Sequence, residues 1–244
     1  MTRRALPGGI VRRVRRYMLP FIPSRSEAWD RAAGVETQEV AELSDLTVDA
    51  GSIEDGFSYV ATPPRLVRAW LDALDVPLPL FTLVDLGSGR GRVLLMASER
   101  PFRRVLGVEF AAELHASALD NIRRFPRARM RCTNVNSICA DAASFAFPLE
   151  PLVIYLNNPF SERVMTGVLR KLAYSYEHEP RPIVVVYQQR VVEEPRHSTN
   201  NLGLLDQQQF LTGRMLRFSP MDRLFLQPFL VRIYATPEAR QLRG

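Results

Sequence analysis

The 244-residue sequence has few of the residues from which disulfide frameworks and metal sites are built. Its only cysteines are Cys132 and Cys139, which are too few for a disulfide framework and lack metal-ligand spacing, so we expect a reducing, cytoplasmic compartment. The three histidines are scattered along the chain, and no metal site is expected. No apolar run approaches the roughly 20 residues of a membrane-spanning helix, which argues against a transmembrane segment.

Lysine is almost absent, and the charged residues are unevenly distributed. Lys171 is the only lysine among 32 basic residues, which we attribute to the nucleotide composition of the genome. Residues 1–23 carry six arginines and no acid, whereas residues 24–60 carry nine acids and two arginines. The acidic stretch either packs against the basic remainder of the chain or forms a solvated face, and we prefer the second interpretation. The chain therefore divides into a basic tail (1–23), an acidic N-terminal extension (24–60) and a main domain (61–244).

The basic tail has two interpretations. Val11, Val14 and Met18 stand at helical spacing with arginines between them, an arrangement that suits an anionic membrane surface or a nucleic acid. A short helix bounded by Pro20 and Pro23 is not stable alone, so a disordered tail is the simpler interpretation. An Arg-rich, acid-free start also resembles an organelle transit peptide.

The main domain reads as alternating strands and helices. Near-continuous apolar strands separated by helices predict a parallel sheet covered on both faces. Two late apolar segments are close enough in sequence to form an antiparallel hairpin. The expected strands are 81–86, 104–109, 135–139, 152–156 and 182–187, the expected helices include 91–99 and 111–124, and the hairpin segments are 210–218 and 225–234. The predicted fold is an α/β, Rossmann-like doubly wound sheet, mostly parallel with a C-terminal antiparallel hairpin.

A further helix is expected after Pro63 and Pro64, which suit a first helical turn. Apolar residues follow at the spacing i, i+3, i+4, i+7, and we interpret this stripe as core packing. The stripe consists of Val67, Trp70, Leu71 and Leu74.

Residues 83–97, LVDLGSGRGRVLLMA, combine a strand, a glycine loop and a helix start. Glycines at alternate positions 87, 89 and 91 let a backbone turn sharply and approach a ligand, an arrangement typical of a nucleoside-type cofactor site. The dinucleotide fingerprint requires glycine where this chain has Arg92, and the phosphate-loop pattern is absent. The remaining pattern, D-L-G-S-G-x-G after a strand, resembles motif I of the class I S-adenosylmethionine-dependent methyltransferases.

Three acids follow strand ends in the order that this resemblance implies. Asp85 would meet the cofactor's ammonium group through water or orient loop amides, although it also suits a turn or cap. Glu109, with Phe110 after it, would accept both ribose hydroxyls, although acids also start helices. Asp141, followed by Ala142, would accept the adenine amino group, although Asp is also a common helix N-cap.

The sequence Tyr155-Leu-Asn-Asn-Pro-Phe160 follows the fourth strand and is expected to face the transferable methyl group. Asn157 and Asn158 would provide oxygens to an amine, and Phe160 an apolar wall. The plain alternative is an Asn-Pro turn. Tyr59 and Tyr187 are candidates to border the acceptor pocket.

These motifs together resemble the class I methyltransferase series over residues 59–235. The Asn157 loop is similar to the Asn-Pro-Pro-aromatic loop of N-methyltransferases, with Asn158 in place of the first proline, and to the Asn-Asn-Phe loop of non-SET histone-lysine methyltransferases. The extended pattern resembles a bacterial group of unassigned substrate; it consists of Gly-Val-Glu-Thr at 34–37, Tyr59 before Thr-Pro-Pro at 62–64, and Asn-Pro-Phe at 158–160. The resemblance implies S-adenosylmethionine as cofactor and residues 61–244 as a methyltransferase domain. The implied catalytic residues are Asn157, Asn158 and Phe160, and the implied cofactor-binding residues are Asp85, Gly87, Ser88, Gly89, Gly91, Glu109, Phe110, Asp141, Ala142 and Asn157.

The predicted function is methyl transfer from S-adenosylmethionine to an amino or amide nitrogen of a protein or small molecule, which is the unknown partner. The Arg-rich tail would bring the protein to an anionic surface, so that it is cytoplasmic and peripheral to a membrane. Two alternatives stay open at this point, a non-catalytic S-adenosylmethionine-binding module and an NAD-dependent oxidoreductase, and Arg92 weakens the second.

Overall fold

The computed structural model describes residues 25–38, 60–158, 160–190, 201–219, 222, 226 and 229–242. The basic tail, most of the acidic extension with Tyr59, and Pro159 lie outside these ranges. The helices are α2 (Arg25–Ala33), α3 (Pro64–Asp72), α4 (Arg92–Ser98), α5 (Ala112–Arg124), α6 (Glu162–His178), α7 (Asn201–Asp206) and α9 (Pro237–Gln241). The strands are β1 (Thr82–Leu86), β2 (Arg104–Glu109), β3 (Val135–Cys139), β4 (Leu152–Asn157), β5 (Ile183–Arg190), β6 (Thr212–Met215) and β7 (Phe229–Ala235).

These seven strands form one sheet in the order β3-β2-β1-β4-β5-β7-β6. Strands β1 to β5 pair in parallel, and β7 pairs antiparallel with both β5 and β6. The predicted parallel sheet with a C-terminal hairpin is confirmed. The chain leaves β1 for β2 on one side and returns to β4 on the other, so the strand order reverses between β1 and β4. Ligands of open α/β sheets bind at such a switch point, outside the carboxyl ends of the strands.

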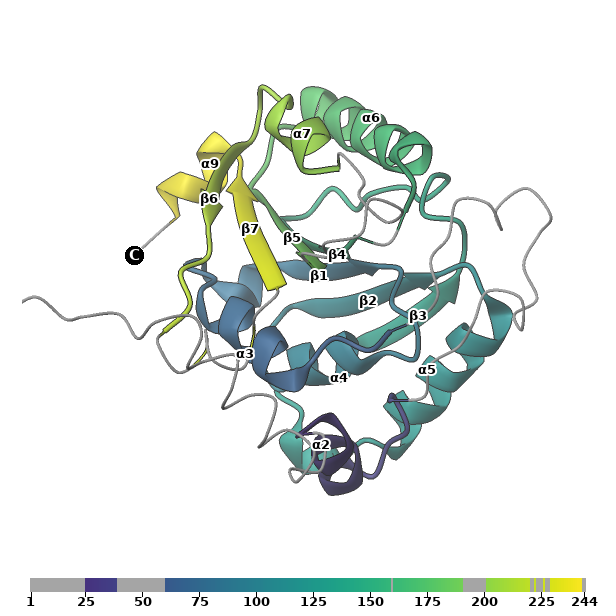
Figure 1. The fold of residues 1–244 in the computed structure, drawn as a ribbon. Coiled ribbons are helices and arrows are strands. Elements are labelled where there is room, and N and C mark those ends of the chain that lie inside the picture. The colour runs from purple at the N-terminus through teal and green to yellow at the C-terminus, as the bar shows by residue number, and fades with distance from the viewer. Residues whose placement is uncertain are drawn as a thin grey trace, which may run out of the picture.

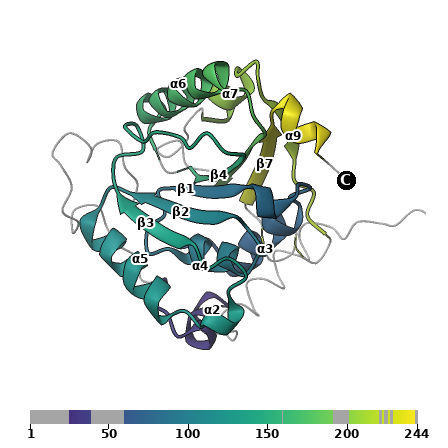
Figure 2. The ribbon, with the colours of Figure 1, turned by 180° about the vertical axis from the view of Figure 1, so that it is seen from behind.

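Helices cover both faces of the sheet (Figures 1 and 2). Side chains alternate along a strand, so Val153 and Tyr155 of β4 belong to the core under α3 and α4, while Ile154 and Leu156 belong to the core under α6. This two-sided burial explains why the strands read as continuous apolar runs. None of the helices in the described ranges is both long and apolar enough to cross a membrane.

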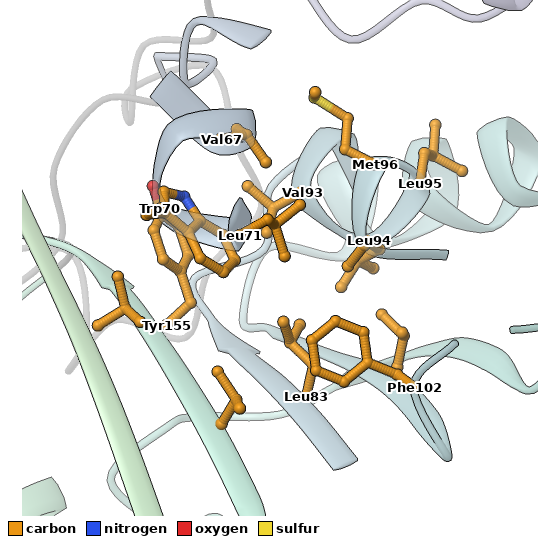
Figure 3. Close-up of a cluster of buried hydrophobic side chains, with 14 of the residues drawn as sticks. Val67, Trp70, Leu71, Leu83, Val93, Leu94, Leu95, Met96, Phe102 and Tyr155 are labelled. Carbon is orange, nitrogen blue, oxygen red and sulfur yellow. The ribbon is translucent and has the colours of Figure 1, made fainter. Parts of the chain in front are cut away.

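Helix α3 carries the apolar stripe predicted from its sequence. Pro64 occupies its first turn, and Val67, Trp70 and Leu71 are buried against β1, β4 and α4 (Figure 3). The Trp70 ring stacks on Tyr155 of β4, with 4.8 Å between centroids. The stripe is therefore core packing, as expected, and it supports the side of β4 that leads to the Asn157 loop.

The described part of the acidic extension, residues 25–38, packs on the domain. Trp29 of α2 lies in the same core as α3 and α4 and stacks on Phe125 at 6.2 Å. Glu36 is exposed, but Asp30 is buried and its Oδ1 lies 2.9 Å from Nη2 of Arg92. The preferred interpretation of the acidic stretch as a solvated face is therefore wrong for Asp30. Asp30 is buried because the guanidinium of Arg92 is itself buried, and an acid that pairs with it must be buried as well.

Candidate active site

The glycine loop joins β1 to α4 at the switch point. Gly87, Gly89 and Gly91 all have positive φ, at 83°, 52° and 84°. At Gly91 a side chain would also meet Cβ of Ala118 at 3.2 Å, because the loop passes directly over α5. Glycine is therefore required at position 91 by both backbone conformation and packing.

Glu109 at the end of β2 holds the glycine loop. Its Oε2 accepts the backbone N–H of Gly89 at 2.7 Å, and its Oε1 accepts the N–H of Ala111 at 3.1 Å. Burial raises the pKa of Glu109, and the backbone hydrogen bonds partly offset that rise. A carboxylate oxygen accepts more than one hydrogen bond, so Glu109 keeps acceptor positions that a ribose could occupy.

Asp85, the last but one residue of β1, is 3% exposed and has no hydrogen-bond or ion-pair partner within the described chain. Burial, followed by repulsion from Glu109, raises the pKa of Asp85 well above its ordinary value. Asp85 therefore does not orient loop amides, a role that Glu109 performs at Gly89. A buried carboxylate without a donor is costly, and it fits a ligand that brings a positively charged or N–H group.

Because Asp85 has no partner in the fold, we expect it to lower the stability of the cofactor-free protein and to strengthen binding of the cofactor. A carboxyl with a higher pKa in the fold than in the unfolded chain loses stability as pH rises from its ordinary pKa of about 3.8 toward the folded-state pKa. We expect Asp85→Asn to raise the melting temperature of the cofactor-free protein at pH 7.5 by a few degrees, since 1 kcal/mol is worth roughly 2–4 °C in a chain of this size.

Calorimetric melting from pH 4 to 8 checks this expectation. The difference between Asp85→Asn and the unsubstituted protein should shrink toward pH 4, and the variant should bind S-adenosylmethionine more weakly at pH 7.5. The matched control is Asp75→Asn, because Asp75 is an exposed aspartate between α3 and β1. A variant that melts lower than the unsubstituted protein throughout this pH range would show that Asp85 has a partner in the fold.

Other predicted cofactor residues line the same edge but differ in exposure. Asp141 after β3 is exposed, and its Oδ1 accepts the N–H of Ala143 at 2.9 Å, which is the turn-capping role of its alternative interpretation. Phe110 is half-buried, whereas Ala142 is packed into the core under α6. The Ser88 side chain points at β2, because a Cβ on Gly107 would lie 2.5 Å from its Oγ.

The Asn157 loop leaves β4 beside the glycine loop. Asn157 Oδ1 accepts from Gln188 Nε2 at 2.9 Å, and its Nδ2 donates to Thr62 Oγ1 at 3.2 Å. Asn158 has a φ of 41°, a left-handed conformation that Asn tolerates and proline cannot adopt. Proline therefore could not occupy position 158 in this backbone conformation.

Asn158 and Phe160 are fixed from β5 and α7. Asn158 Oδ1 accepts from the Tyr187 hydroxyl at 2.6 Å and from Asn201 Nδ2 at 3.0 Å. Phe160 is buried, and its carbonyl accepts a second Asn201 hydrogen bond at 3.0 Å. Tyr187, predicted to border the acceptor pocket, thus reaches the loop directly.

Arg92 is the residue whose role the sequence reasoning missed. It starts α4 directly after Gly91, is 2% exposed, and uses all five of its N–H donors. Its acceptors are Thr37 Oγ1 at 2.6 Å, Asp30 Oδ1 at 2.9 Å, Gln38 Oε1 at 2.9 Å, Ser26 Oγ at 3.2 Å and the Thr62 carbonyl at 3.2 Å. Arg92 therefore joins the glycine loop to residues 26–38 and to the approach of α3.

Two further polar residues, Thr62 and Gln188, were also missed. Gln188 pairs in register with Asn157 across β4 and β5, and both Gln188 and Thr62 are buried. The signal for Gln188 was present, because it is the first strongly polar residue after the apolar run of β5. Thr62 gives no such signal, since its position near Asn157 depends on how α3 packs.

Known protein families and structures match the part of the chain that bears the site. A family model described as "Putative methyltransferase" matches residues 80–166, which contain the glycine loop, Glu109, Asp141 and the Asn157 loop. A search of curated proteins finds no match. Among solved structures, the methyltransferase domain of bacterial CtHen1 is 14% identical with a TM-score of 0.50, covering 71% of this chain and 97% of that one.

Two other solved structures are similar to this chain. A Leishmania major S-adenosylmethionine-dependent methyltransferase is 10% identical with a TM-score of 0.50, covering 70% of this chain and 71% of that one. An RNA methyltransferase from Salinibacter ruber, in complex with S-adenosyl-L-homocysteine, is 20% identical with a TM-score of 0.44, covering 73% of this chain and 95% of that one. The strand order agrees with these matches: residues 80–166 match a methyltransferase family model, and the fold is the one found in the CtHen1 and Leishmania major methyltransferases.

Proposed function

We propose that this protein is a methyltransferase, which transfers the methyl group of S-adenosylmethionine to an amino or amide nitrogen of a protein or small molecule. The observation that carries the proposal is the held carboxamide of Asn157 at the switch point. Its Oδ1 uses one acceptor position on Gln188 and keeps another, which suits an N–H of the methyl acceptor. The sulfonium cofactor supplies an electrophilic methyl group, so the main task of the protein is to hold a nucleophile in line with it.

The cofactor would be held by the residues that follow β1, β2 and β3. Glu109 would accept the ribose hydroxyls, Asp85 would face the ammonium group of the methionine part, and Asp141 would accept the adenine amino group. Gly87, Gly89 and Gly91 would let the backbone approach the cofactor closely. The unpartnered carboxylate of Asp85 supports this assignment, because a cationic ligand offsets its burial.

The chemistry around Asn157 favours nitrogen over a hydroxyl acceptor. The side chains that contact the Asn157 carboxamide, Thr62 and Gln188, carry no charge. Tyr155, next in the same hydrogen-bond network, has a pKa raised well above its ordinary value by burial, so it stays protonated at neutral pH. A neutral amine already offers a lone pair, whereas a hydroxyl needs a base to remove its proton.

Asn157→Ala tests the acceptor assignment. We expect turnover to fall by about 30-fold, equivalent to about 2 kcal/mol, because the acceptor loses its positioning partner. Affinity for S-adenosylmethionine, measured by calorimetry, should change by less than about threefold, since most cofactor contacts are expected elsewhere. The assay follows tritium from methyl-labelled S-adenosylmethionine into the proteins and small molecules of a cell extract.

Alkali treatment of the product separates a nitrogen acceptor from a carboxyl acceptor, and chromatography of the hydrolysed product separates N-methyl from O-methyl compounds. Label on nitrogen survives alkali, whereas label on a carboxyl ester is released as methanol. Asn136→Ala, an exposed asparagine on β3, is the matched control and should keep full turnover. Alkali-labile product, or unchanged turnover in Asn157→Ala with intact cofactor affinity, would contradict a nitrogen acceptor held by Asn157.

A further inference from the structure

Four buried or half-buried side chains, three from β4 and β5 and one from the segment before α3, form a closed ring of hydrogen bonds. Gln188 Nε2 donates to Asn157 Oδ1 at 2.9 Å, and Asn157 Nδ2 donates to Thr62 Oγ1 at 3.2 Å. The Thr62 hydroxyl lies 3.1 Å from that of Tyr155, which donates to Gln188 Oε1 at 2.8 Å. Because the Tyr155 proton is used on Gln188, the Thr62 hydroxyl must donate to Tyr155. Every donor in the ring then points the same way around it.

Such a ring fixes the carboxamide of Asn157 at both ends. Each member donates one hydrogen bond and accepts one, and hydrogen bonds arranged in a chain strengthen one another. The second lone pair of Asn157 Oδ1 and the second hydrogen of Nδ2 remain outside the ring. The ring therefore fixes the directions in which Asn157 offers one oxygen lone pair and one N–H to a ligand near the switch point.

Each of the other three members is held by an independent part of the fold. Tyr155 is stacked on Trp70 of α3, and Gln188 is in register with Asn157 on the neighbouring strand and fully buried. Thr62 is 6% exposed, and its carbonyl accepts a hydrogen bond from Arg92 at 3.2 Å. Through Thr62, the ring is linked to the first residue after the glycine loop.

We propose that Thr62 and Gln188 are positioning residues for methyl transfer, which hold the Asn157 carboxamide in the orientation that the methyl acceptor requires. This inference rests on the function proposed above. Thr62 is the junction, since its side chain belongs to the ring and its carbonyl to the Arg92 network. Thr62 thereby fixes the position of the Asn157 carboxamide relative to the glycine loop.

The ring itself is tested by nuclear magnetic resonance of protein labelled with 15N-asparagine. The side-chain NH₂ signals of Asn157 are assigned by their loss in Asn157→Asp. In Thr62→Val, which keeps the shape of the side chain but removes its hydroxyl, we expect these signals to move upfield and to exchange faster with water. Thr62→Ser keeps the hydroxyl and should restore them. Tyr155→Phe, which retains the stacking on Trp70, is the second variant if Thr62→Val folds poorly.

Turnover in the tritium assay tests the functional part. We expect Thr62→Val to lower kcat by about tenfold, with the dissociation constant of S-adenosylmethionine within about twofold, and Thr62→Ser to recover most of the loss. Unchanged Asn157 signals in both Thr62→Val and Tyr155→Phe would overturn the ring. Altered signals with unchanged kcat would overturn the positioning role. Cofactor binding without transfer to any extract fraction would instead overturn the proposed function, and with it the role of the ring, while leaving the ring's geometry supported.

Discussion

Replacing Glu109 by alanine should weaken the binding of S-adenosylmethionine by roughly 300-fold. Hydrogen bonds to a charged group are worth about 1.5–3 kcal/mol each, and loss of two ribose contacts at about 1.7 kcal/mol each corresponds to that factor. Glu109 also holds Gly89 through its Oε2, so the variant releases the glycine loop as well as the ribose. Calorimetric titration of the purified protein measures the dissociation constant directly.

Two comparisons make the Glu109 experiment specific. NADH titrated in parallel should show no binding, because the dinucleotide pattern is interrupted by a buried Arg92. Asp141→Ala should weaken S-adenosylmethionine by a much smaller factor, since Asp141 is exposed and an exposed hydrogen bond competes with water. Folded Glu109→Ala protein that binds the cofactor as tightly as the unsubstituted enzyme would show that the ribose does not lie at the end of β2.

Replacing Arg92 by methionine should lower the free energy of unfolding by about 3–5 kcal/mol. The substitution removes five hydrogen bonds and leaves the carboxylate of Asp30 buried without its cation, which is the costly way to break a buried ion pair. Chemical denaturation followed by tryptophan fluorescence measures the change, and it reports on this region because Trp29 lies 5.9 Å from the Arg92 guanidinium.

Matched variants separate burial from charge in the Arg92 experiment. Arg100→Met removes an ion pair with Asp72 that is exposed on the surface, and it should cost no more than about 1 kcal/mol. The double variant Arg92→Met with Asp30→Leu removes both buried charges, so it should recover part of the loss. An Arg92→Met protein as stable as Arg100→Met would mean that residues 26–38 are not held through Arg92.

Strand positions followed from the sequence because the sheet is covered on both faces. β2 and β3 have the bounds expected of them, and β1 and β4 differ by a single residue at one end. The other strands differ more: β6 (Thr212–Met215) is shorter than the predicted 210–218, β7 is Phe229–Ala235 where 225–234 was predicted, and β5 begins at Ile183 and continues to Arg190 beyond the apolar run that ended the prediction at residue 187. The extra residues of β5 pair with β7, down to Arg190 opposite Phe229. β5 is therefore extended by its pairing with neighbouring strands and not by the hydrophobicity of its own residues.

Sequence patterns located the candidate site but not its supports. Polar residues at the carboxyl ends of β1, β2 and β4 lie at one edge of a parallel sheet for geometric reasons, so the alternation of strands and helices is enough to group Asp85, Glu109 and Asn157. Gln188 follows the same rule and was missed because the predicted strand ended at residue 187, one residue before Gln188. Thr62 could not be found in this way, because it reaches Asn157 through the docking of α3.

The amino-acid sequence alone determined the fold class, because apolar periodicity is a local property of the chain, and its glycine spacing and motif resemblance led to the expected cofactor and to the edge of the sheet where the candidate site lies. Tertiary structure decided what each polar side chain contacts. Arg92 served in the sequence only to weaken the dinucleotide interpretation, yet in the fold it donates hydrogen bonds to acceptors from residues 26 to 62. Asp30, expected among solvated acids, is buried beside it. A buried charge is stable only with partners brought from distant parts of the chain, and no local pattern records which partners those are.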